Sequence, residues 1–228
     1  MKKGKLIVID GSDGVGKATQ TKLLVERLKK EGKKVVTLDF PRYEHNFFGK
    51  FIGACLAGKH GEFVKVDPYI CSVLYAADRH ESKEFIQKAL ANGKTVVLDR
   101  YVSANQMHQG GKIKDGKKRK EFLKWLDFME HGAFGIPCPD LIIYLHLPVA
   151  LSVTLLQKKS AGAKKKYIKG GMDTVESDLK YLANAQKSAL KIISEGARWY
   201  KIECNKGKTI LPREDIHEQV WKIVKKLE

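Results

Sequence analysis

Glycines and a lysine near the N-terminus have the spacing needed to bind a nucleoside triphosphate. The stretch LIVIDGSDGVGKATQ contains the pattern G-x-x-x-x-G-K. Such glycines let successive backbone N–H groups converge on phosphate oxygens, and the lysine reaches the β- and γ-phosphates. An apolar run precedes the pattern and helical spacing follows it, which favours a phosphate loop over a glycine-rich turn that binds nothing. The predicted ATP site consists of Gly11, Ser12, Asp13, Gly14, Val15, Gly16, Lys17, Ala18 and Thr19.

The last position of this loop departs from the usual pattern, which has Ser or Thr where this chain has Ala18. A methyl group cannot coordinate magnesium, and Thr19 lies about 100° further around the helix, so it cannot take the same place. Asp99 ends the apolar run TVVLD and is therefore the predicted protein ligand of Mg²⁺, either directly or through water. The alternative for Asp99 is a strand-terminal cap.

Three arginines outside the lysine-rich segments predict a second phosphate-binding site. Arg42 follows the predicted strand 33–40 in FPRY, and Arg100 is the last residue of the predicted strand 94–100, at the start of DRYVSANQMHQGG. Arg79 lies in the helical segment LYAADRHE. Arginine suits a phosphate monoester because its planar fork can donate two parallel hydrogen bonds. Each arginine alone could form an ordinary surface ion pair, but the three together favour an anion site beside the phosphate loop.

Apolar runs rich in β-branched residues alternate with helical patterns along the chain. Most of these runs are apolar almost throughout, which is typical of strands covered on both faces in a parallel sheet. The pattern predicts an α/β fold with a doubly wound parallel β-sheet of about five strands, and ligands at the carboxyl ends of the strands. The predicted strands are residues 5–10, 33–40, 94–100, 140–147 and 199–204.

The predicted helices begin and end at recognisable signals. Gly32 is a predicted C-terminal cap, and Asp67 followed by Pro68 predicts the start of a helix that continues to Gly93. Residues 109–120 and 158–173 are rich in Gly and Lys and are predicted to be exposed, mobile loops. We find no linker, so residues 1–228 are predicted to form a single domain. The predicted helices are residues 16–33, 67–93, 148–159, 173–196 and 212–228.

Composition restricts the partners and the compartment. The chain has 43 Lys and Arg against 26 Asp and Glu, a net charge of +17 that favours nucleotides, nucleic acid or a membrane surface as partners. The four cysteines are scattered without a C-x-x-C pair, which predicts a reduced, cytoplasmic setting. The first apolar run is too short for a signal peptide or a membrane span.

Six segments between residue 5 and about residue 205 occur together in a specific order. They resemble those of the thymidylate kinase family, P-loop nucleoside monophosphate kinases that phosphorylate dTMP with ATP. The resemblance implies a P-loop NTPase-type three-layer sandwich with a mobile lid, and Mg²⁺ as the cofactor. The segments are DGSDGVGKATQ, FPRY, LYAADRHE, DRYVSANQMHQGG, PDLIIYLHLP and DTVESDLKYL.

The resemblance implies catalytic roles for Lys17, Arg100 and Asp13. Asp13 matches an acidic residue near the 3′-hydroxyl of the acceptor sugar. Arg79 and Arg100 match arginines that handle the acceptor phosphate, with Arg100 also bridging toward the transferring group. Arg42 matches a further contact on the phosphate side.

The resemblance also implies a thymine pocket. Tyr75 matches the aromatic residue that stacks on the base, although from the residues alone a buried core aromatic is the alternative. Arg79 lies near the base edge, Gln106 is a polar residue of the pocket and Asn105 is its neighbour. Phe40 completes the predicted acceptor site, and the Phe40–Pro41 bond is expected to be cis.

Residues 158–173 occupy the position of the family's lid. Gly14 stands where some members carry a basic residue in the phosphate loop, so this chain resembles members whose lid supplies the cation. No arginine occurs between Arg119 and Arg198, which makes lysines of the lid the candidates. The lid cations predicted to act are Lys164, Lys165 and Lys166.

The expected partners are ATP, dTMP and a second copy of the chain, with no membrane. Helices such as residues 68–91 could form the homodimer contact. One alternative is a related kinase that acts on dUMP, dCMP or a deoxynucleoside. Another is a P-loop protein that binds nucleic acid through its lysines, although the sequence lacks the aromatic interleaving that single-strand binders use for base stacking.

Overall fold

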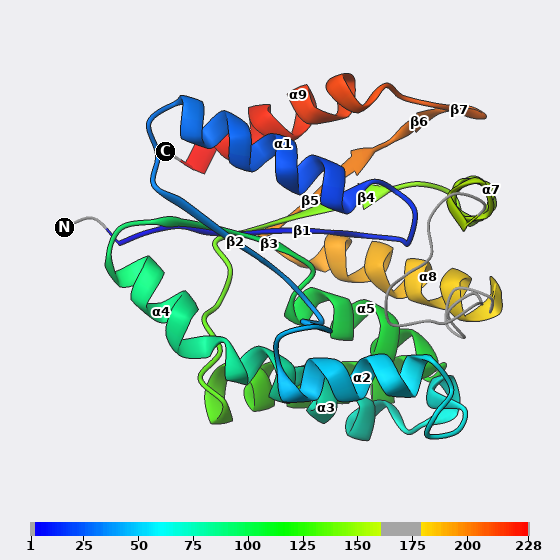
Figure 1. Cartoon of the computed structure of the whole chain (residues 1–228). Coiled ribbons are helices and arrows are strands. Elements are labelled where there is room, and N and C mark those ends of the chain that lie inside the picture. The colour runs from blue at the N-terminus through cyan, green and yellow to red at the C-terminus, as the bar shows by residue number, and fades with distance from the viewer. Residues whose placement is uncertain (1–2, 161–178, 228) are drawn as a thin grey trace.

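The computed structural model describes residues 3–160 and 179–227, and its centre is a parallel sheet of five strands. The strand order is β2-β3-β1-β4-β5, so the first strand lies in the middle (Figure 1). Because β1 pairs with β3 on one side and β4 on the other, the loops after these strands meet at one sheet edge. The strands are β1 (Leu6–Gly11), β2 (Val35–Asp39), β3 (Thr95–Asp99), β4 (Leu141–His146) and β5 (Trp199–Glu203).

Helices cover both faces of this sheet. Figure 1 shows α1 (Lys17–Lys30) and α9 (Arg213–Val224) on one face, with α4 (Lys83–Ala91), α5 (Val102–Lys112) and α8 (Leu179–Glu195) on the other. Beyond the second face lie α2 (Phe47–Leu56) and α3 (Pro68–Glu81), as Figure 1 shows, and α6 (Gly116–Asp127) packs against α3 and α5. The remaining helix, α7 (Val149–Ser160), follows β4. The predicted three-layer α/β sandwich is confirmed, with an extra helical layer on one side.

Alternation along the central strand explains why both faces need a helical cover. Ile7 and Ile9 pack into the core beneath α1 and α9, whereas Leu6 and Val8 pack into the core on the α4 side. All four side chains are at most 2% exposed. Continuous burial of this kind produces the unbroken apolar run that the sequence shows, in place of an alternation of apolar and polar residues.

The predicted single helix over residues 67–93 is wrong in one respect, because the chain breaks at Ser82 into α3 and α4. Asp67 does cap α3, accepting hydrogen bonds from the backbone N–H groups of Tyr69 and Ile70. At the break, the Asn46 side chain donates to the Ser82 hydroxyl at 3.1 Å. The change of direction lets α3 pack against α2 while α4 packs on β3.

The predicted loop over residues 109–120 is also wrong. Helix α5 continues to Lys112, and α6 begins at Gly116 after Asp115, whose carboxylate accepts a hydrogen bond from Lys118 N at 2.8 Å. The glycines that suggested a loop instead permit close helix packing. A Cβ atom on Gly111 would lie 2.8 Å from the backbone nitrogen of Ala185 in α8.

Several other features were missed or lie outside the described residues. Helices α2 and α6 were not predicted from the sequence, and neither was the short hairpin of β6 (Asn205–Lys206) and β7 (Thr209–Ile210). Residues 158–160 belong to the end of α7, and the rest of the predicted lid lies outside the described residues. The Phe40–Pro41 bond is cis, as expected. Within the described parts of the chain, no helix is both long enough and apolar enough to cross a membrane.

Candidate active site

The phosphate loop connects β1 to α1 through backbone conformations that only glycine adopts readily. Gly16 is the N-cap of α1 with φ +97°, and no side chain caps the helix there. A Cβ atom on Gly11 would lie 2.5 Å from the carbonyl oxygen of Leu145 in the neighbouring strand. The first N–H groups of α1 therefore point toward the loop without a side-chain acceptor, which is the arrangement that binds an anion.

Lys17 lies inside this loop with its ammonium group among oxygen atoms. Its Nζ donates to the carbonyl oxygens of Gly11 at 3.1 Å and Ser12 at 2.8 Å. The carboxylate of Asp13 lies 3.5 Å from the same nitrogen. Burial, together with the nearby charge of Arg100, lowers the pKa of Lys17. Additional negative charge, such as that of a phosphate, would stabilise this ammonium group.

Arg100 joins the end of β3 to the phosphate loop. Its guanidinium forms a short ion pair with Asp13 and lies 3.3 Å from Nε2 of His108. Burial opposes its charge, but the carboxylates of Asp13 and Asp10 outweigh that effect and raise the pKa of Arg100. Its φ of +64° is the one positive φ of a non-glycine residue in the described parts of the chain. The backbone thus adopts a disfavoured conformation where this side chain meets the loop.

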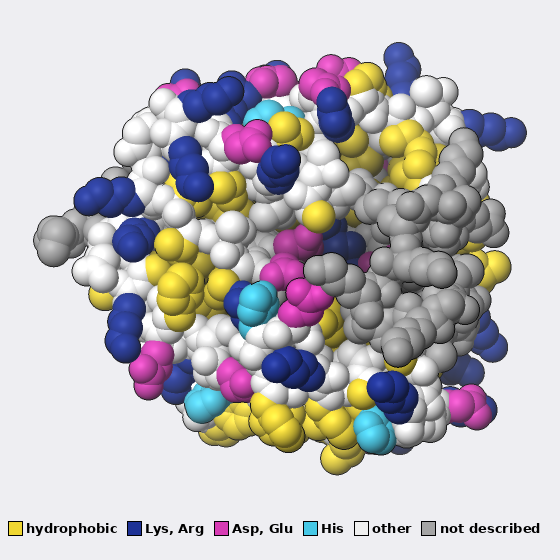
Figure 2. All heavy atoms as spheres, viewed as in Figure 1, with side chains coloured by type: hydrophobic (Ala, Val, Ile, Leu, Met, Phe, Trp, Pro, Cys, Tyr) yellow, Lys and Arg dark blue, Asp and Glu magenta, His cyan; other side chains and the backbone are white. Residues whose placement is uncertain are grey.

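Two aspartates lie behind these cations. Asp10 is fully buried, and its carboxylate accepts hydrogen bonds from Ser103 Oγ at 2.5 Å and from Gly11 N at 2.8 Å. Asp99 ends β3 as predicted, and burial raises its pKa although Lys17 and Arg100 act in the opposite direction. Figure 2 shows acidic and basic side chains gathered in a hollow at the middle of one face.

A network of side chains fixes the segment that carries Arg42. The backbone nitrogen of Arg42 donates to Asp78 Oδ2 at 3.1 Å. Asn46 donates to the backbone oxygen of Asp78 at 2.7 Å and to its carboxylate at 2.9 Å. Gly49 is required at this point because a Cβ atom there would lie 2.2 Å from the Arg42 carbonyl oxygen. The segment is therefore held rigidly, and the Arg42 side chain is half-buried.

Arg79 is the most deeply buried of the three arginines, with 2% of its surface exposed. Its Nε donates to Glu130 Oε2 at 2.8 Å, and its Nη2 forms a short contact with Glu130 Oε1. Its Nη1 donates to the carbonyl oxygen of Tyr101 at 3.3 Å. Asn105 donates to the same Glu130 carboxylate at 3.1 Å. The Arg79 charge is thus neutralised by a carboxylate that is itself fully buried, whereas Asp13, the partner of Arg100, is partly exposed.

The other predicted acceptor residues lie on neighbouring elements. Tyr75 precedes Arg79 by one turn of α3 and is half-buried, with its ring 6.0 Å from that of Phe63. Phe40 is 4% exposed and packs against Tyr101 at a ring separation of 5.9 Å. The backbone oxygen of Gln106 accepts a hydrogen bond from Ser188.

Comparisons with known proteins identify the family of this chain. The family model described as thymidylate kinase matches residues 9–216. The thymidylate kinase of Mycobacterium tuberculosis (strain ATCC 25618 / H37Rv) is 30% identical over 196 residues, which cover 85% of this chain and 89% of that protein. This chain belongs to the thymidylate kinase family.

Other relatives extend the match over nearly the whole chain. A thymidylate kinase of Schizosaccharomyces pombe is 27% identical over 222 residues, covering 97% of this chain and 92% of that protein. The solved structure of thymidylate kinase from Candida albicans has the same fold, with a TM-score of 0.70 at 22% identity. That structure covers 98% of this chain, and 92% of its own chain is matched. The family assignment and the fold are therefore both supported over most of the sequence.

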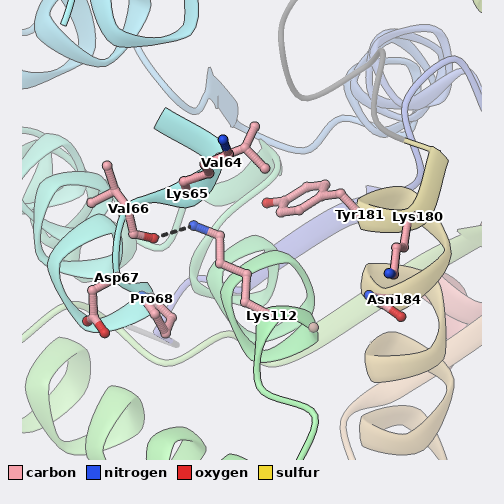
Figure 3. A pocket seen from close by; sticks show the side chains of 10 residues that line it. Val64, Lys65, Val66, Asp67, Pro68, Lys112, Lys180, Tyr181 and Asn184 are labelled. Atoms are coloured by element: carbon pink, nitrogen blue, oxygen red, sulfur yellow. Dashed lines mark hydrogen bonds between the residues drawn. The ribbon is translucent and has the colours of Figure 1, made fainter. Parts of the chain in front are cut away.

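A pocket of about 480 Å³ lies beside the site of this thymidylate kinase family member. Lys112, one turn of α5 beyond His108, reaches across it and donates to the carbonyl oxygen of Val66 at 2.8 Å (Figure 3). Tyr181 of α8 lines the pocket, and its ring stacks on that of His108 at 5.7 Å. His108 therefore connects the pocket to Arg100 and the phosphate loop.

Glu130, His108 and Asp10 contribute to the site but were missed in the sequence analysis. Asp10 had a usable signal, because it is a carboxylate at the carboxyl end of the strand before the loop. Glu130 lies outside every quoted segment, and His108 lies within DRYVSANQMHQGG but was given no role there; only the fold brings the two residues to Arg79 and Arg100. The predicted lid lysines, Lys164 to Lys166, lie outside the described residues.

Proposed function

We infer that this member of the thymidylate kinase family transfers the γ-phosphoryl group of ATP to dTMP, giving ADP and dTDP. The observation that carries this conclusion is the convergence of two cationic groups at one sheet edge: Lys17 within the phosphate loop and Arg100 at the end of β3. Their side chains share a single carboxylate, that of Asp13. An enzyme that moves a phosphoryl group between two nucleotides needs cations at this junction.

We propose that phosphates replace the protein's own oxygen atoms around these cations. Lys17 would exchange carbonyl contacts for the β- and γ-phosphate oxygens of ATP, and Arg100 would exchange part of its contact with Asp13 for the acceptor phosphate. A general base is unnecessary because the attacking oxygen of a nucleoside monophosphate is already anionic. Most of the acceleration would come from alignment and from spreading negative charge over fixed cations.

The side chains available as metal ligands fit a Mg²⁺ ion that is held mainly by the substrate phosphates. Among the described residues, no group of three or more His, Cys, Asp or Glu side chains could hold a metal ion. Mg²⁺ commonly uses one or two carboxylates together with phosphates and water, and Asp99 supplies such a carboxylate beside Lys17. When bound, the ion would neutralise charge on the donor phosphates. Ala18 supplies no ligand, so Asp99 is the proposed anchor.

For the acceptor site, we propose that Tyr75 stacks on the base while Arg79, Asn105 and Gln106 line its polar edge. Phe40 supports the pocket through its packing on Tyr101, and Arg42 faces the acceptor phosphate. The neutralised Arg79–Glu130 pair supports a contact with the uncharged base in preference to the phosphate. The lid lysines 164–166 remain the candidates for extra cations during transfer.

We also propose that the enzyme is a homodimer in the cytoplasm. Apolar side chains are exposed on two adjacent helices: Phe47 and Phe51 of α2 are 71% and 36% exposed, and Ile70 and Val73 of α3 are 58% and 38% exposed. A second copy seated on this face would remove these groups from water. The four cysteines are free thiols, which supports a reducing compartment. Sedimentation of the wild type and of Val73→Glu would test the dimer, since a charge there should favour the monomer.

The activity is tested by measuring ADP release with dTMP, dUMP, dCMP and thymidine as acceptors, with and without Mg²⁺. We expect dTMP to have the highest kcat/KM and Arg100→Ala to lower it by on the order of 100-fold or more. Preference for another acceptor would point to a related kinase of different specificity. Tight, salt-sensitive DNA binding without dTMP turnover would instead support the nucleic-acid-binding alternative.

A further inference from the structure

We propose that Glu130 is a positioning residue that sets base selectivity, because it fixes Arg79 as a hydrogen-bond donor and Asn105 as an acceptor toward the substrate base. This inference rests on the proposed acceptor site and concerns a residue outside every motif of the sequence. It implies selectivity for pyrimidines that carry a 4-oxo group and an N3–H group over those that carry a 4-amino group.

The contacts of Glu130 define its role. Its side chain is fully buried and accepts hydrogen bonds from Arg79 Nε at 2.8 Å and from Asn105 Nδ2 at 3.1 Å, besides the short contact with Arg79 Nη2. An ionised carboxylate can only accept hydrogen bonds. Glu130 therefore orients the N–H groups of Arg79 and Asn105 toward itself, and the Asn105 side-chain oxygen cannot face it.

The orientation of the Asn105 amide follows from this arrangement. Its nitrogen donates one hydrogen to Glu130 and the other to the backbone oxygen of Ser72 at 3.2 Å. Both partners are acceptors, so the NH₂ group must face them and the amide cannot be flipped. Asn105 can then offer only its Oδ1, an acceptor, to a ligand.

Arg79 has more hydrogen-bond donors than its contacts with Glu130 and Tyr101 use. A guanidinium has five N–H groups, and three of them serve Glu130 and the Tyr101 carbonyl oxygen. The remaining N–H groups can only donate. Asn105 and Arg79 both bind the same carboxylate, so the proposed acceptor site offers the base a hydrogen-bond acceptor and a hydrogen-bond donor side by side.

This donor–acceptor pair matches one class of base. Thymine and uracil present a carbonyl acceptor at position 4 beside the N3–H donor, whereas cytosine presents an amino donor beside an N3 acceptor. Cytosine would place donor against donor and acceptor against acceptor. A site built around such hydrogen bonds rejects a mismatched substrate strongly because its buried polar groups are left unpaired.

The decisive variant is Glu130→Gln, whose amide NH₂ can donate to Asn105, so that the Ser72 carbonyl oxygen alone still favours the original orientation of the Asn105 amide. We expect kcat/KM for dTMP and for dUMP to fall by on the order of 10- to 100-fold, mainly through KM. The KM for ATP should stay within about 2-fold of the wild type, because the phosphate loop is untouched. The preference for dTMP over dCMP should narrow by on the order of 10-fold.

Asp140→Asn is the matched control. This carboxylate also accepts hydrogen bonds from the protein, at 2.8 Å from Leu6 N and 3.1 Å from Lys5 Nζ, but at the opposite end of the central strand from the phosphate loop. We expect it to lower the melting temperature without changing the ratio of dTMP to dCMP turnover. Glu130→Asp keeps an acceptor-only group and should retain most of the wild-type ratio even if KM rises.

Two outcomes would overturn the inference. One is a wild-type ratio of dTMP to dCMP turnover in Glu130→Gln; the other is an equal rise in the KM values of dTMP and ATP. If Glu130→Gln does not fold, the pair Arg79→Met with Glu130→Met replaces the buried ions by apolar groups of similar volume, a change that buried pairs often tolerate. That double variant should lose its discrimination against dCMP, and retention of the wild-type preference would overturn the inference as well.

The wild-type measurement separates this inference from the proposed function. If the wild type does not turn over dTMP, the proposed function itself fails. If it prefers dTMP and the Glu130 variants keep that preference, only the role of Glu130 fails.

Discussion

The proposed donor edge, which is Gly11 to Lys17 together with Arg100, and the proposed acceptor pocket around Arg79, Asn105 and Glu130 hold their charged groups in different ways. At the donor edge, consecutive residues of one loop supply backbone groups, and the cations Lys17 and Arg100 rest on oxygens that a phosphate can replace. In the acceptor pocket, side chains from distant parts of the chain meet, and the charge of Arg79 is already matched by Glu130. The first region is suited to anions and the second to a neutral base.

This difference shows that buried charge has two uses in the same fold. An ammonium group whose pKa is lowered gains from an arriving anion, so Lys17 is prepared to bind phosphate. A guanidinium paired with a buried carboxylate gains little from an anion, but it presents donors in a fixed geometry. Substitutions in the two regions should therefore have different effects on turnover and on stability.

The largest expected effect is on turnover and concerns the donor edge. Lys17→Ala should lower kcat by on the order of 100-fold or more, because a cation that stabilises transferring charge is lost. Removing a buried ammonium group with a lowered pKa should leave the melting temperature unchanged or slightly raised. Steady-state kinetics and thermal denaturation of the same preparation check both statements. Near-normal turnover would refute the role assigned to Lys17.

The next effect is on stability and concerns the acceptor pocket. Arg79→Ala should lower the free energy of unfolding by about 3–5 kcal/mol, because the fully buried Glu130 carboxylate loses its partner. Arg100→Ala should lower it much less, since Asp13 is partly exposed and water can solvate it. Urea denaturation of the two variants provides the comparison. Equal losses would show that the two regions do not differ in the way described.

A smaller effect depends on pH and concerns His108, which lies between the two regions. Burial and the neighbouring Arg100 lower the pKa of His108 to about 3. The unfolded chain binds a proton near pH 6.5 and the folded chain does not, so stability falls as the pH falls below 6.5. We expect a loss of about 1–2 kcal/mol between pH 6.5 and 5 that His108→Phe abolishes. Denaturation of both proteins at the two pH values measures it, and an unchanged slope would contradict the assignment.

The smallest expected effect is on stability and concerns Asp115, which lies outside both regions and serves as a control. Asp115→Ala removes the N-cap of α6 and should cost about 1 kcal/mol of stability. Its KM values for ATP and dTMP should equal those of the wild type. A change in either KM would mean that loss of stability alone perturbs the site.

The strand–loop–helix arrangement of the phosphate loop could be predicted from the sequence because its residues are local. Gly11 to Lys17 lie in one short stretch, and the apolar run before them identifies the strand that positions them. The acceptor pocket is not local: Glu130 reaches Arg79 across 51 residues. Glu130 lies in a π-helical turn, Phe128–Ala133, and the residue spacing that predicts an α-helix does not apply to such a turn.

The loop predicted at Gly110 and Gly111 was wrong because glycine has two structural uses that the sequence does not distinguish. The same residue type favours a loop when it supplies conformational freedom and favours a helix contact when it supplies space. Gly111 needs the space, because Ala185 of α8 leaves no room for a side chain. Only the position of the neighbouring helix distinguishes these two uses, and that position depends on the whole sheet.

The left-handed backbone at Arg100 has a practical consequence for engineering this enzyme. An L-residue in that conformation costs about 1 kcal/mol that glycine avoids, so Arg100→Gly should destabilise the fold less than Arg100→Ala, because relief of the backbone strain offsets part of the lost ion pair with Asp13. Libraries sorted only for folding could then retain a variant whose phosphoryl transfer is slower by on the order of 100-fold. Any such selection on this protein therefore needs a catalytic assay in every round.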